Sequence, residues 1–442
     1  MLSNRYSTIL KVAIPLMAGT FIQSVVMITD AAFLSRFSTV SFDAAGNAGL
    51  IYLTLFMGLT GLGDAAQIVI AKEIGTKKFN AINSLLQSSF MLNLAVGLLF
   101  FILVVVFIPA LLNSYSLNIN IANEQVDFLS IRSFGFFAAA LMLTLNAYFM
   151  AIGKTWVIFM STIIFAVSNI ILDYLLVFGF GEVNAMGIKG AAIASVIAEW
   201  LSVITLFILF FMNSERKKWS LLLHLEIAKN AFVRLLKVGS PLVVQGFFAL
   251  ATWTVFFAWI EQLGTYQLTV SQNIRAVYFL AFIPIFGFAA TTRTFIAQYI
   301  KSNRQHDIPI IIKRIQWLTV LFLILFFHGA LFYPEKLILA INPSEVYLAD
   351  SVSILRFIFG SILLFGIATP LFQTINGSGN TRVTLLIEII SISVYLIFAY
   401  LFVKSWELSI IQIWFVEYIY FGSILIASFI YLRFFEWKKK NF

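Results

Sequence analysis

Long apolar segments recur along almost the whole chain, and they constrain its fold more than any other feature of the sequence. The first runs from Lys11 to Arg36, and as a helix with a rise of 1.5 Å per residue it is long enough to cross a hydrocarbon core of ~30 Å. Of the 442 residues, 61% are hydrophobic and 11% are charged, whereas soluble domains have ~25% charged residues. These values predict an all-α integral membrane protein. Twelve transmembrane helices are expected, over residues 11–35, 46–71, 84–111, 127–151, 155–180, 188–212, 238–262, 270–297, 312–333, 351–375, 382–403 and 408–432.

The composition also excludes several kinds of chemistry. Without cysteine the chain has neither disulfides nor thiolate metal ligands, and two of its three histidines, His224 and His306, fall in polar loops. The phosphate-binding pattern GxxxxGK[ST] is missing, so direct ATP drive is not expected. A membrane-embedded hydrolase is a remote alternative, because it would need a nucleophile–base pair or metal ligands within the spans, and neither is visible in the sequence. We therefore expect a non-enzyme without a cofactor or a resident metal.

The basic net charge of +9 is explained by membrane topology and not by nucleic-acid binding. If the spans alternate across the membrane, most of the 29 Lys and Arg lie on the side of the N-terminus. Cytoplasmic loops are enriched in these residues, so both termini are expected in the cytoplasm of a multi-pass protein of the cell membrane. The N-terminal stub is short and leads directly into a full-length span, which is not typical of a cleavable signal peptide.

The two halves of the sequence are related by an internal repeat. The segment LKVAIPL (Leu10–Leu16) recurs in the second half as LKVGSPL (Leu236–Leu242). The offset that takes Leu10 to Leu236 also takes Gly153-Lys154-Thr155 to Gly379-Asn380-Thr381. A repeat of six spans returns the chain to the same side of the membrane, so the two copies have the same orientation. We predict two pseudo-symmetric lobes of six helices, residues 1–213 and 238–442, joined by a basic and partly amphipathic cytoplasmic linker over residues 214–237.

The repeat separates shared features from private ones. Pro15 and Pro241 are equivalent, so a bend in the first helix of each lobe is expected to be architectural. Asp30 corresponds to Phe256, and Asp173 corresponds to Ala399. An aspartate within a span costs ~2.5–3.5 kcal/mol to insert and is by default a functional candidate. The two aspartates of the first lobe are therefore candidates for function.

These two aspartates are predicted to lie at the same depth. Asp30 follows Lys11 by 19 residues, Asp173 follows Lys154 by 19 residues, and both helices run in the same direction. Asn169 lies one turn before Asp173, and Gln23 lies two turns before Asp30. Burial and mutual repulsion make it costly to ionise both carboxylates, so the pair is expected to bind H⁺ or Na⁺ as a unit. The alternative is a structural hydrogen-bond network between helices.

Two glutamates, Glu199 and Glu417, lie near the middle of spans 6 and 12 and are candidate repeat partners. They are expected either to line a substrate cavity that attracts cations or, because both halves keep them, to have a structural role.

The run SNIILDYLLVFGFGEVNAMGIKGAAIAS (Ser168–Ser195) resembles the multidrug and toxic compound extrusion (MATE) family. It is more similar to the DinF-like branch, because the aspartates lie in spans 1 and 5 while spans 8 and 10 have no acidic residue. The resemblance implies two lobes flanking a cavity, alternating access, and export of organic cations or amphipathic compounds in exchange for H⁺ or Na⁺. It places the coupling ion at Asp30, Gln23, Asn146, Asn169 and Asp173, with Ser195 as the counterpart of a family threonine, and the bend of helix 1 at Pro15.

The runner-up function is a flippase for lipids or lipid-linked oligosaccharides. Such a protein is expected to line its cavity with cations that hold a pyrophosphate, whereas the charges within the spans are mainly acidic here. The expected partners are therefore small cationic or amphipathic molecules and the bilayer itself, with no nucleic acid and with the chain acting as a monomer.

Overall fold

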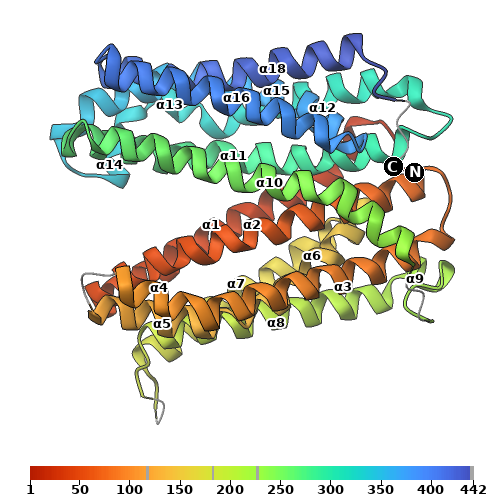
Figure 1. The fold of residues 1–442 in the computed structure, drawn as a ribbon, viewed down its shortest axis with the longest axis horizontal. Coiled ribbons are helices and arrows are strands. Elements are labelled where there is room, and N and C mark those ends of the chain that lie inside the picture. Colours follow the sequence, from red (N-terminus) through yellow and green to blue (C-terminus); the bar gives the residue numbers. More distant parts are fainter. Residues whose placement is uncertain (116–118, 182–183, 225–227, 439–442) are drawn as a thin grey trace. The chain divides into compact units, whose positions relative to one another are not determined.

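The computed structural model describes residues 1–115, 119–181, 184–224 and 228–438, and its regular elements are helices (Figure 1). Lys439 and Lys440, which contribute to the charge of the C-terminal end, lie outside the described residues. The helices of the first half are α1 (Tyr6–Phe37), α2 (Thr39–Gly75), α3 (Asn80–Ile102), α4 (Ile108–Tyr115), α5 (Ile119–Arg132), α6 (Gly135–Ala151), α7 (Trp156–Phe178), α8 (Ile188–Met212) and α9 (Ser214–Lys218). A π-helical turn, Leu103–Phe107, joins α3 to α4.

The second half has the same kind of elements. Its helices are α10 (Lys229–Glu261), α11 (Thr265–Tyr299), α12 (Ile308–Phe327), α13 (Gly329–Phe332), α14 (Pro334–Ile341), α15 (Leu348–Gly377), α16 (Thr381–Tyr400), α17 (Ile410–Ile413) and α18 (Val416–Phe434). Within the described residues, eleven helical segments are long and apolar enough to cross a membrane, and the bent pair α5 and α6 brings the number to twelve. The prediction of an all-α membrane protein with twelve spans is confirmed.

The fourth span differs from the continuous helix expected over residues 127–151. It is broken at Ser133 and Phe134, where α5 and α6 meet at 44°. The Ser133 hydroxyl donates to the carbonyl of Ser130 (2.6 Å), a local bond that competes with the backbone hydrogen bonds of a helix. Gly135 follows directly, and Ser and Gly are typical of helix kinks.

The segment between the halves is also more ordered than the expected linker over residues 214–237. Its second part is helical, because α10 begins at Lys229, and residues 225–227 lie outside the described residues. Its first part packs on the start of α3: Trp219 stacks on Phe79 with ring centroids 4.8 Å apart, and the backbone N–H of Leu222 donates to Asn83 (2.9 Å). Trp219 and Leu221 of this linker are therefore used for contacts within the protein, whereas Leu223 is exposed.

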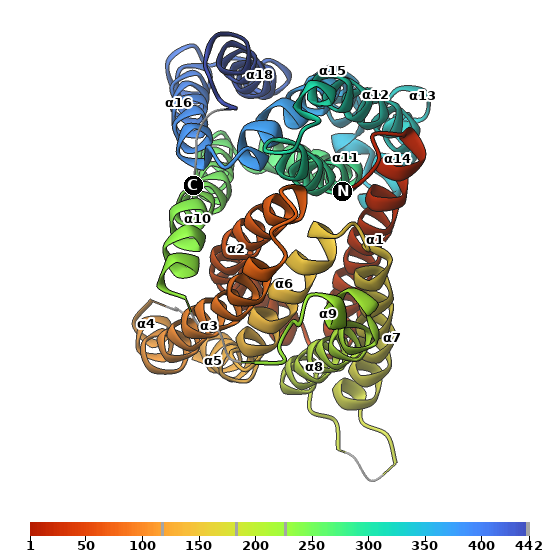
Figure 2. The same ribbon diagram turned by 90° about the vertical axis from the view of Figure 1, so that its right-hand side faces the viewer.

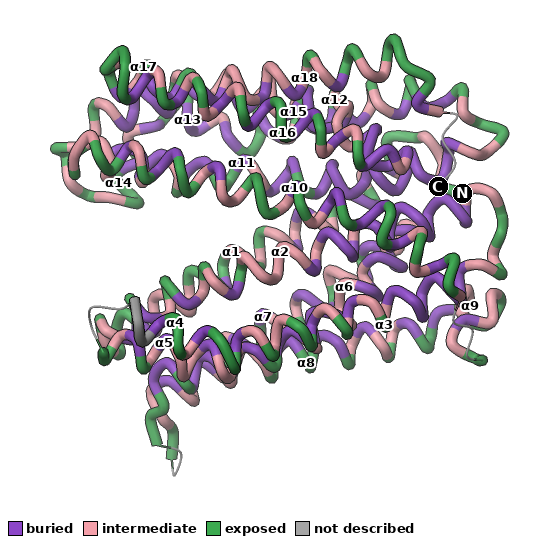
Figure 3. The backbone as a smooth tube through the Cα atoms, viewed as in Figure 1, coloured by how far each residue is buried: buried purple, intermediate pink, exposed green. Residues whose placement is uncertain are grey.

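Contacts divide the chain into two compact units, Ile14–Val243 and Met1–Ala13 with Val244–Phe442. In the unit Ile14–Val243, α7 lies beside α8, and α2 packs against α3, α5 and α6 (Figures 1 and 2). In the other unit, α15 packs against α11, α12 and α18. The most buried stretches are the C-terminal ends of α2 and α11, residues 65–74 and 287–300 (Figure 3).

Helices α1 and α10 each belong to both units, and the change occurs close to their prolines. In α1 it lies between Ala13 and Ile14, just before Pro15, and in α10 it lies between Val243 and Val244, just after Pro241. Each repeat therefore begins with a helix whose N-terminal part packs with the other repeat.

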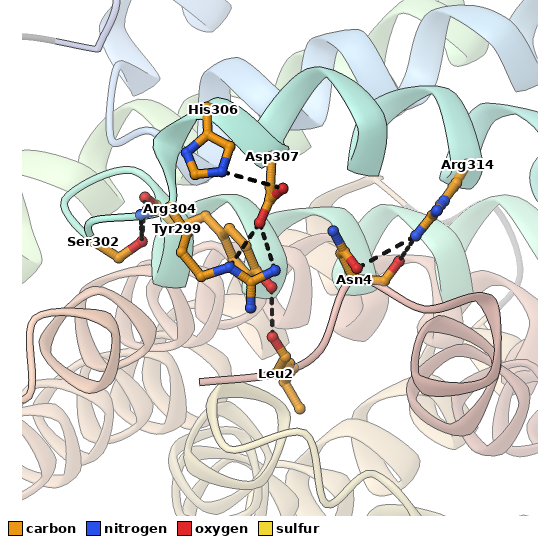
Figure 4. A network of polar contacts seen from close by, with 8 residues as sticks. All are labelled: Leu2, Asn4, Tyr299, Ser302, Arg304, His306, Asp307 and Arg314. Carbon is orange, nitrogen blue, oxygen red and sulfur yellow. Dashed lines mark hydrogen bonds and ion pairs between the residues drawn. The ribbon is translucent and has the colours of Figure 1, made fainter.

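Matching contacts hold these N-terminal parts. In one unit the Tyr299 hydroxyl donates to the carbonyl of Leu2 (2.6 Å), and Arg314 binds the carbonyl of Asn4 (Figure 4). In the other unit Arg234 of α10 forms an ion pair with Glu73. Glu73 and Tyr299 are equivalent positions of the repeat, so the last turn of α2 and of α11 has the same task in both halves.

Candidate ion-coupling site

Helices α1 and α7 pack side by side in a register that brings the two aspartates together. A Cβ atom built on Gly19 would lie 3.6 Å from the Thr162 hydroxyl, an ordinary contact that allows close approach of the two helices. Leu34 and Val177 belong to one buried apolar cluster. Both pairs have the same separation along the sequence as Asp30 and Asp173.

The carboxyl groups of Asp30 and Asp173 lie within hydrogen-bonding contact of one another. Asp173 has no exposed surface. Both of its carboxyl oxygens, and Oδ1 of Asp30, are buried with no hydrogen-bond donor among the described residues. A buried carboxylate without a donor is unfavourable, and two in contact repel each other, so the pair requires a proton or another cation.

The amide of Asn169 and a hydroxyl group from α8 extend the polar side of this site. Asn169 of α7 is fully buried, and its Nδ2 donates to the Ser195 hydroxyl of α8 (3.4 Å). The Oδ1 atoms of Asn169 and of Asn146 on α6 are buried and have no hydrogen-bond donor in the part of the chain that the structure describes. The oxygens of Asn169, Asp173 and Asp30 are hard ligands, which suit H⁺, Na⁺ or similar cations better than soft transition metals.

Two further residues of α1 were assigned roles from the sequence, Gln23 in the ion site and Pro15 at the bend of the helix. Gln23 is exposed on α1, and the structure gives it no hydrogen bond to Asp30 or Asn169. Pro15 is half-buried inside α1, where its missing N–H removes one backbone hydrogen bond of the helix. The structure therefore brings Asp30 to Asp173 and Asn169 to Ser195, and Gln23 belongs to neither pair.

Sequence reasoning missed a second charged group next to the aspartates. Arg132 binds Glu199 (Nη2–Oε1, 2.8 Å), and its guanidinium carbon lies 4.2 Å from the ring centroid of Tyr52. The available signal was an arginine inside a span that also contains a Ser–Gly break, since such a charge needs an acidic partner. Which acidic residue it meets is a matter of tertiary packing.

Glu199 and Glu417 are both held inside their own unit. Glu199 is 9% exposed and paired with Arg132, while Glu417 is 1% exposed and accepts hydrogen bonds from Tyr278 (2.9 Å) and Tyr395 (3.4 Å). A cavity of about 360 Å³ lies elsewhere, and neither glutamate lines it; its walls are Gln87, Phe90, Met91, Leu222, Leu223 and His224. A role of either glutamate in a substrate cavity stays a prediction.

Comparison with known sequences gives one match to the same family in each half of the repeat. The sequence profile of the family MatE matches residues 15–175 and again 241–401, so the second match is displaced from the first by the same offset that relates Pro15 to Pro241. A probable multidrug resistance protein NorM of Thermotoga maritima is 25% identical over 442 residues, which cover 98% of this chain and 93% of that protein. A NorM protein of Synechocystis is 25% identical, with 86% and 84% covered.

Solved structures share the fold. A structure described as MATE in the straight conformation has a TM-score of 0.86 at 18% identity, and one in the bent conformation has 0.85 at 16%. A transporter of the MOP superfamily from Pyrococcus furiosus has 0.85 at 19%. These alignments cover 96% of this chain and 93–94% of the others. Because the family profile covers most of the chain in two matches, the protein belongs to the MatE family of multi-pass membrane transporters, which are not enzymes.

Proposed function

We propose that this protein is a secondary antiporter that exports cationic or amphipathic small molecules in exchange for H⁺ or Na⁺, and that the coupling ion binds at Asp30 and Asp173. The substrate class follows from the relatives that carry the name of multidrug resistance proteins. Those relatives are called NorM, so the placement of this chain in the DinF-like branch stays a prediction that rests on where its acidic residues lie.

The observation that carries this proposal is the contact between two carboxyl groups that have no donors. Asp173 is fully buried, and its two oxygens face Asp30 and not a basic partner at hydrogen-bonding distance. An ion-bound state in which H⁺ or Na⁺ lies between the carboxylates is stabilised, and an empty state is repulsive. The packing of α1 on α7 then depends on the ion.

Pro15 is the point at which α1 would bend when the ion binds or leaves. The residues before it pack with the second half of the chain and the residues after it pack with the first half. A helix that lacks one backbone hydrogen bond bends more easily at that point. Loss of the ion would push Asp30 from Asp173 and bend α1 near Pro15, which supplies the two states that alternating access requires.

Other parts of the proposal follow the sequence. Both termini lie in the cytoplasm by the distribution of Lys and Arg. Each of the repeats forms one lobe, with the boundaries expected above, and the transporter acts as a monomer. Sodium, if it is the coupling ion, would be held by Asp30, Asp173, Asn169 and Asn146, with Ser195 orienting Asn169.

The test is efflux of a fluorescent organic cation from reconstituted vesicles under separately imposed pH and sodium gradients. We expect Asp30→Asn and Asp173→Asn each to reduce gradient-driven efflux at least tenfold, because an amide cannot release a proton and binds Na⁺ weakly. Asp127→Asn is the matched control, since Asp127 is an exposed carboxylate paired with Lys189 on the same unit (3.1 Å). Efflux by Asp30→Asn at the wild-type rate would refute the proposed site.

A further inference from the structure

A buried arginine lies at the break of the fourth span, next to the aspartate pair but not part of it. Arg132 is the last residue of α5, and its side chain is 12% exposed. An arginine inside a membrane span is expensive unless it is paired. Its visible partners are Glu199 (2.8 Å) and the face of Tyr52 (4.2 Å), an ion pair and a cation–π contact.

The residues around Arg132 leave space for the carboxylate of Glu199. Gly135, the first residue of α6, faces the group: a Cβ atom there would overlap the Glu199 carboxylate and would lie 2.8 Å from the Tyr52 hydroxyl. Glu199 also lies at the N-terminal end of α6, where the partial positive charge of a helix favours a carboxylate. The break between α5 and α6 therefore makes room for an acidic side chain that a continuous helix with a larger residue would exclude.

Arg132 nevertheless has hydrogen-bond donors that are not used. Its Nη1 is buried and has no hydrogen-bond acceptor within residues 1–115, 119–181, 184–224 and 228–438. Glu199 takes Nη2 alone. A guanidinium carries five donors and forms its best pairs with two carboxylate oxygens at once, so one half of its binding fork is left open.

Buried acceptor atoms without a donor are found on Glu199 itself, at Oε2, and on the aspartate pair. Phe128, one turn before Arg132, packs in the same apolar cluster as Leu34 and Val177, which lie one turn after Asp30 and Asp173. Arg132, Asp30 and Asp173 are each one helical turn from a member of this cluster, so the three residues lie at a similar depth beside it. The charge of Arg132 acts on both aspartates.

The charged and titratable groups at this depth are few among the described residues. They are Asp30 on α1, Tyr52 on α2, Arg132 on α5, Asp173 on α7 and Glu199 on α8, and α6 contributes Gly135. The exposed pair Asp127–Lys189 lies on α5 and α8. Of the three acidic side chains, Glu199 is the one that forms an ion pair with Arg132 in this structure. When the coupling ion leaves, Arg132 is the positive charge that remains available to the aspartates.

We propose that Arg132 is an internal counter-ion that competes with the coupling ion for the aspartate pair, and that Glu199 restrains it. This inference rests on the proposed function, because it assumes that the aspartates bind the ion. Arg132 is a positioning residue: it contacts neither substrate nor ion, and it sets the ion concentration at which Asp30 and Asp173 become occupied. Glu199 holds the guanidinium while the ion is bound, and the free half of the fork moves toward the aspartates when the ion is released.

The competition makes opposite predictions for the two partners. Arg132→Gln removes the competing charge, so half-maximal efflux should need a roughly tenfold lower concentration of H⁺ or Na⁺. Glu199→Gln frees the arginine, so half-maximal efflux should need a roughly tenfold higher concentration. Arg132→Lys keeps the charge and should stay within about threefold of wild type. The readout is the pH and sodium dependence of dye efflux in the vesicle assay, normalised to the maximal rate of each variant.

A double variant distinguishes a change in ion dependence from a loss of folding. Arg132→Gln alone leaves Glu199 without its partner, whereas Arg132→Gln with Glu199→Gln removes both charges and keeps the net charge of the site. We expect the double variant to shift in the direction of Arg132→Gln, because the competing charge is gone. A structural role would instead lower the maximal rate of all variants without moving the ion dependence in opposite directions.

The outcomes separate this inference from the proposed function. If Asp30→Asn abolishes gradient-driven efflux while Arg132→Gln and Glu199→Gln shift the ion dependence the same way or not at all, the counter-ion role is wrong and the coupling site stands. If Asp30→Asn leaves efflux intact, the coupling site itself is wrong, whatever Arg132 does.

Discussion

The two halves of this protein place very different side chains at equivalent positions. The first half has Asp30, Asn169 and Asp173, and at the corresponding positions of the repeat the second half has Phe256, Tyr395 and Ala399. In the first half these positions contain buried oxygens without donors. In the second half Phe256 is fully buried between Tyr395 and Trp414, with ring centroids at 5.7 Å from each.

The same comparison holds for the glutamates. Glu199 is paired with an arginine, whereas Glu417 receives hydrogen bonds from two tyrosine hydroxyls. Tyr52, beside Glu199, and Tyr278, beside Glu417, are themselves equivalent residues. The repeat thus keeps the same helices in both halves, and the second half fills with rings the positions at which the first half has oxygens without hydrogen-bond donors.

The largest expected loss of stability comes from emptying the filled site. Phe256→Ala should lower the free energy of unfolding by ~3–5 kcal/mol, because it leaves a cavity among rings that cannot collapse. Asp30→Asn at the equivalent position should leave the melting temperature unchanged or raise it, because it removes repulsion. Thermal unfolding of the two variants in detergent measures the difference, and a larger loss for Asp30→Asn would invert the comparison.

The next effect is expected at Glu417. Replacing it by Gln keeps a side-chain oxygen for Tyr278, and the amide group meets Tyr395, whose hydroxyl can accept a hydrogen bond. We expect a loss of ~1 kcal/mol in stability and no change in the ion dependence of efflux. The matched variant is Glu199→Gln, for which a shift is expected. Equal shifts for both variants would show that the halves take equal part in coupling.

The smallest effect is expected at Arg356, which lies two residues before the exact repeat position of Arg132, Ile358. Arg356 pairs with Glu335 at 2.9 Å, and the two side chains are 51% and 47% exposed. Removing such a surface pair costs ~0–1 kcal/mol, whereas removing one partner of a buried pair costs ~3–5 kcal/mol. We expect the melting temperature of Arg356→Ala to remain close to wild type and that of Arg132→Ala to fall clearly. Similar losses would mean that the two arginines have similar roles.

The spans, the repeat and the aspartates were predictable because each depends on local sequence. An apolar run identifies a membrane helix by its length, and an aspartate within it stands out by its cost. The counting of residues from Lys11 and Lys154 also gave the register of α1 against α7, since both helices rise by the same amount per residue. Asn146 and Ser195 came only from the resemblance to a family.

Other features were not predictable. The end of the expected linker proved to be the start of α10, because its charged residues form ion pairs with another helix, as Arg234 does with Glu73. The exposed position of Gln23 also differs from the cluster that spacing suggested, since spacing gives depth along a helix but not the neighbour that each face meets.

By itself the sequence determined the class of the protein, its duplicated helices and the private aspartates, because hydrophobic length and the cost of a buried charge act on short segments. Only the tertiary structure decided that the fourth span breaks before Gly135 and that Arg132 meets Glu199, 67 residues away, beside Asp30 and Asp173. Such a pairing depends on which surfaces of two helices are in contact and on the space that a glycine leaves beside them. The spacing of residues along one helix determines neither.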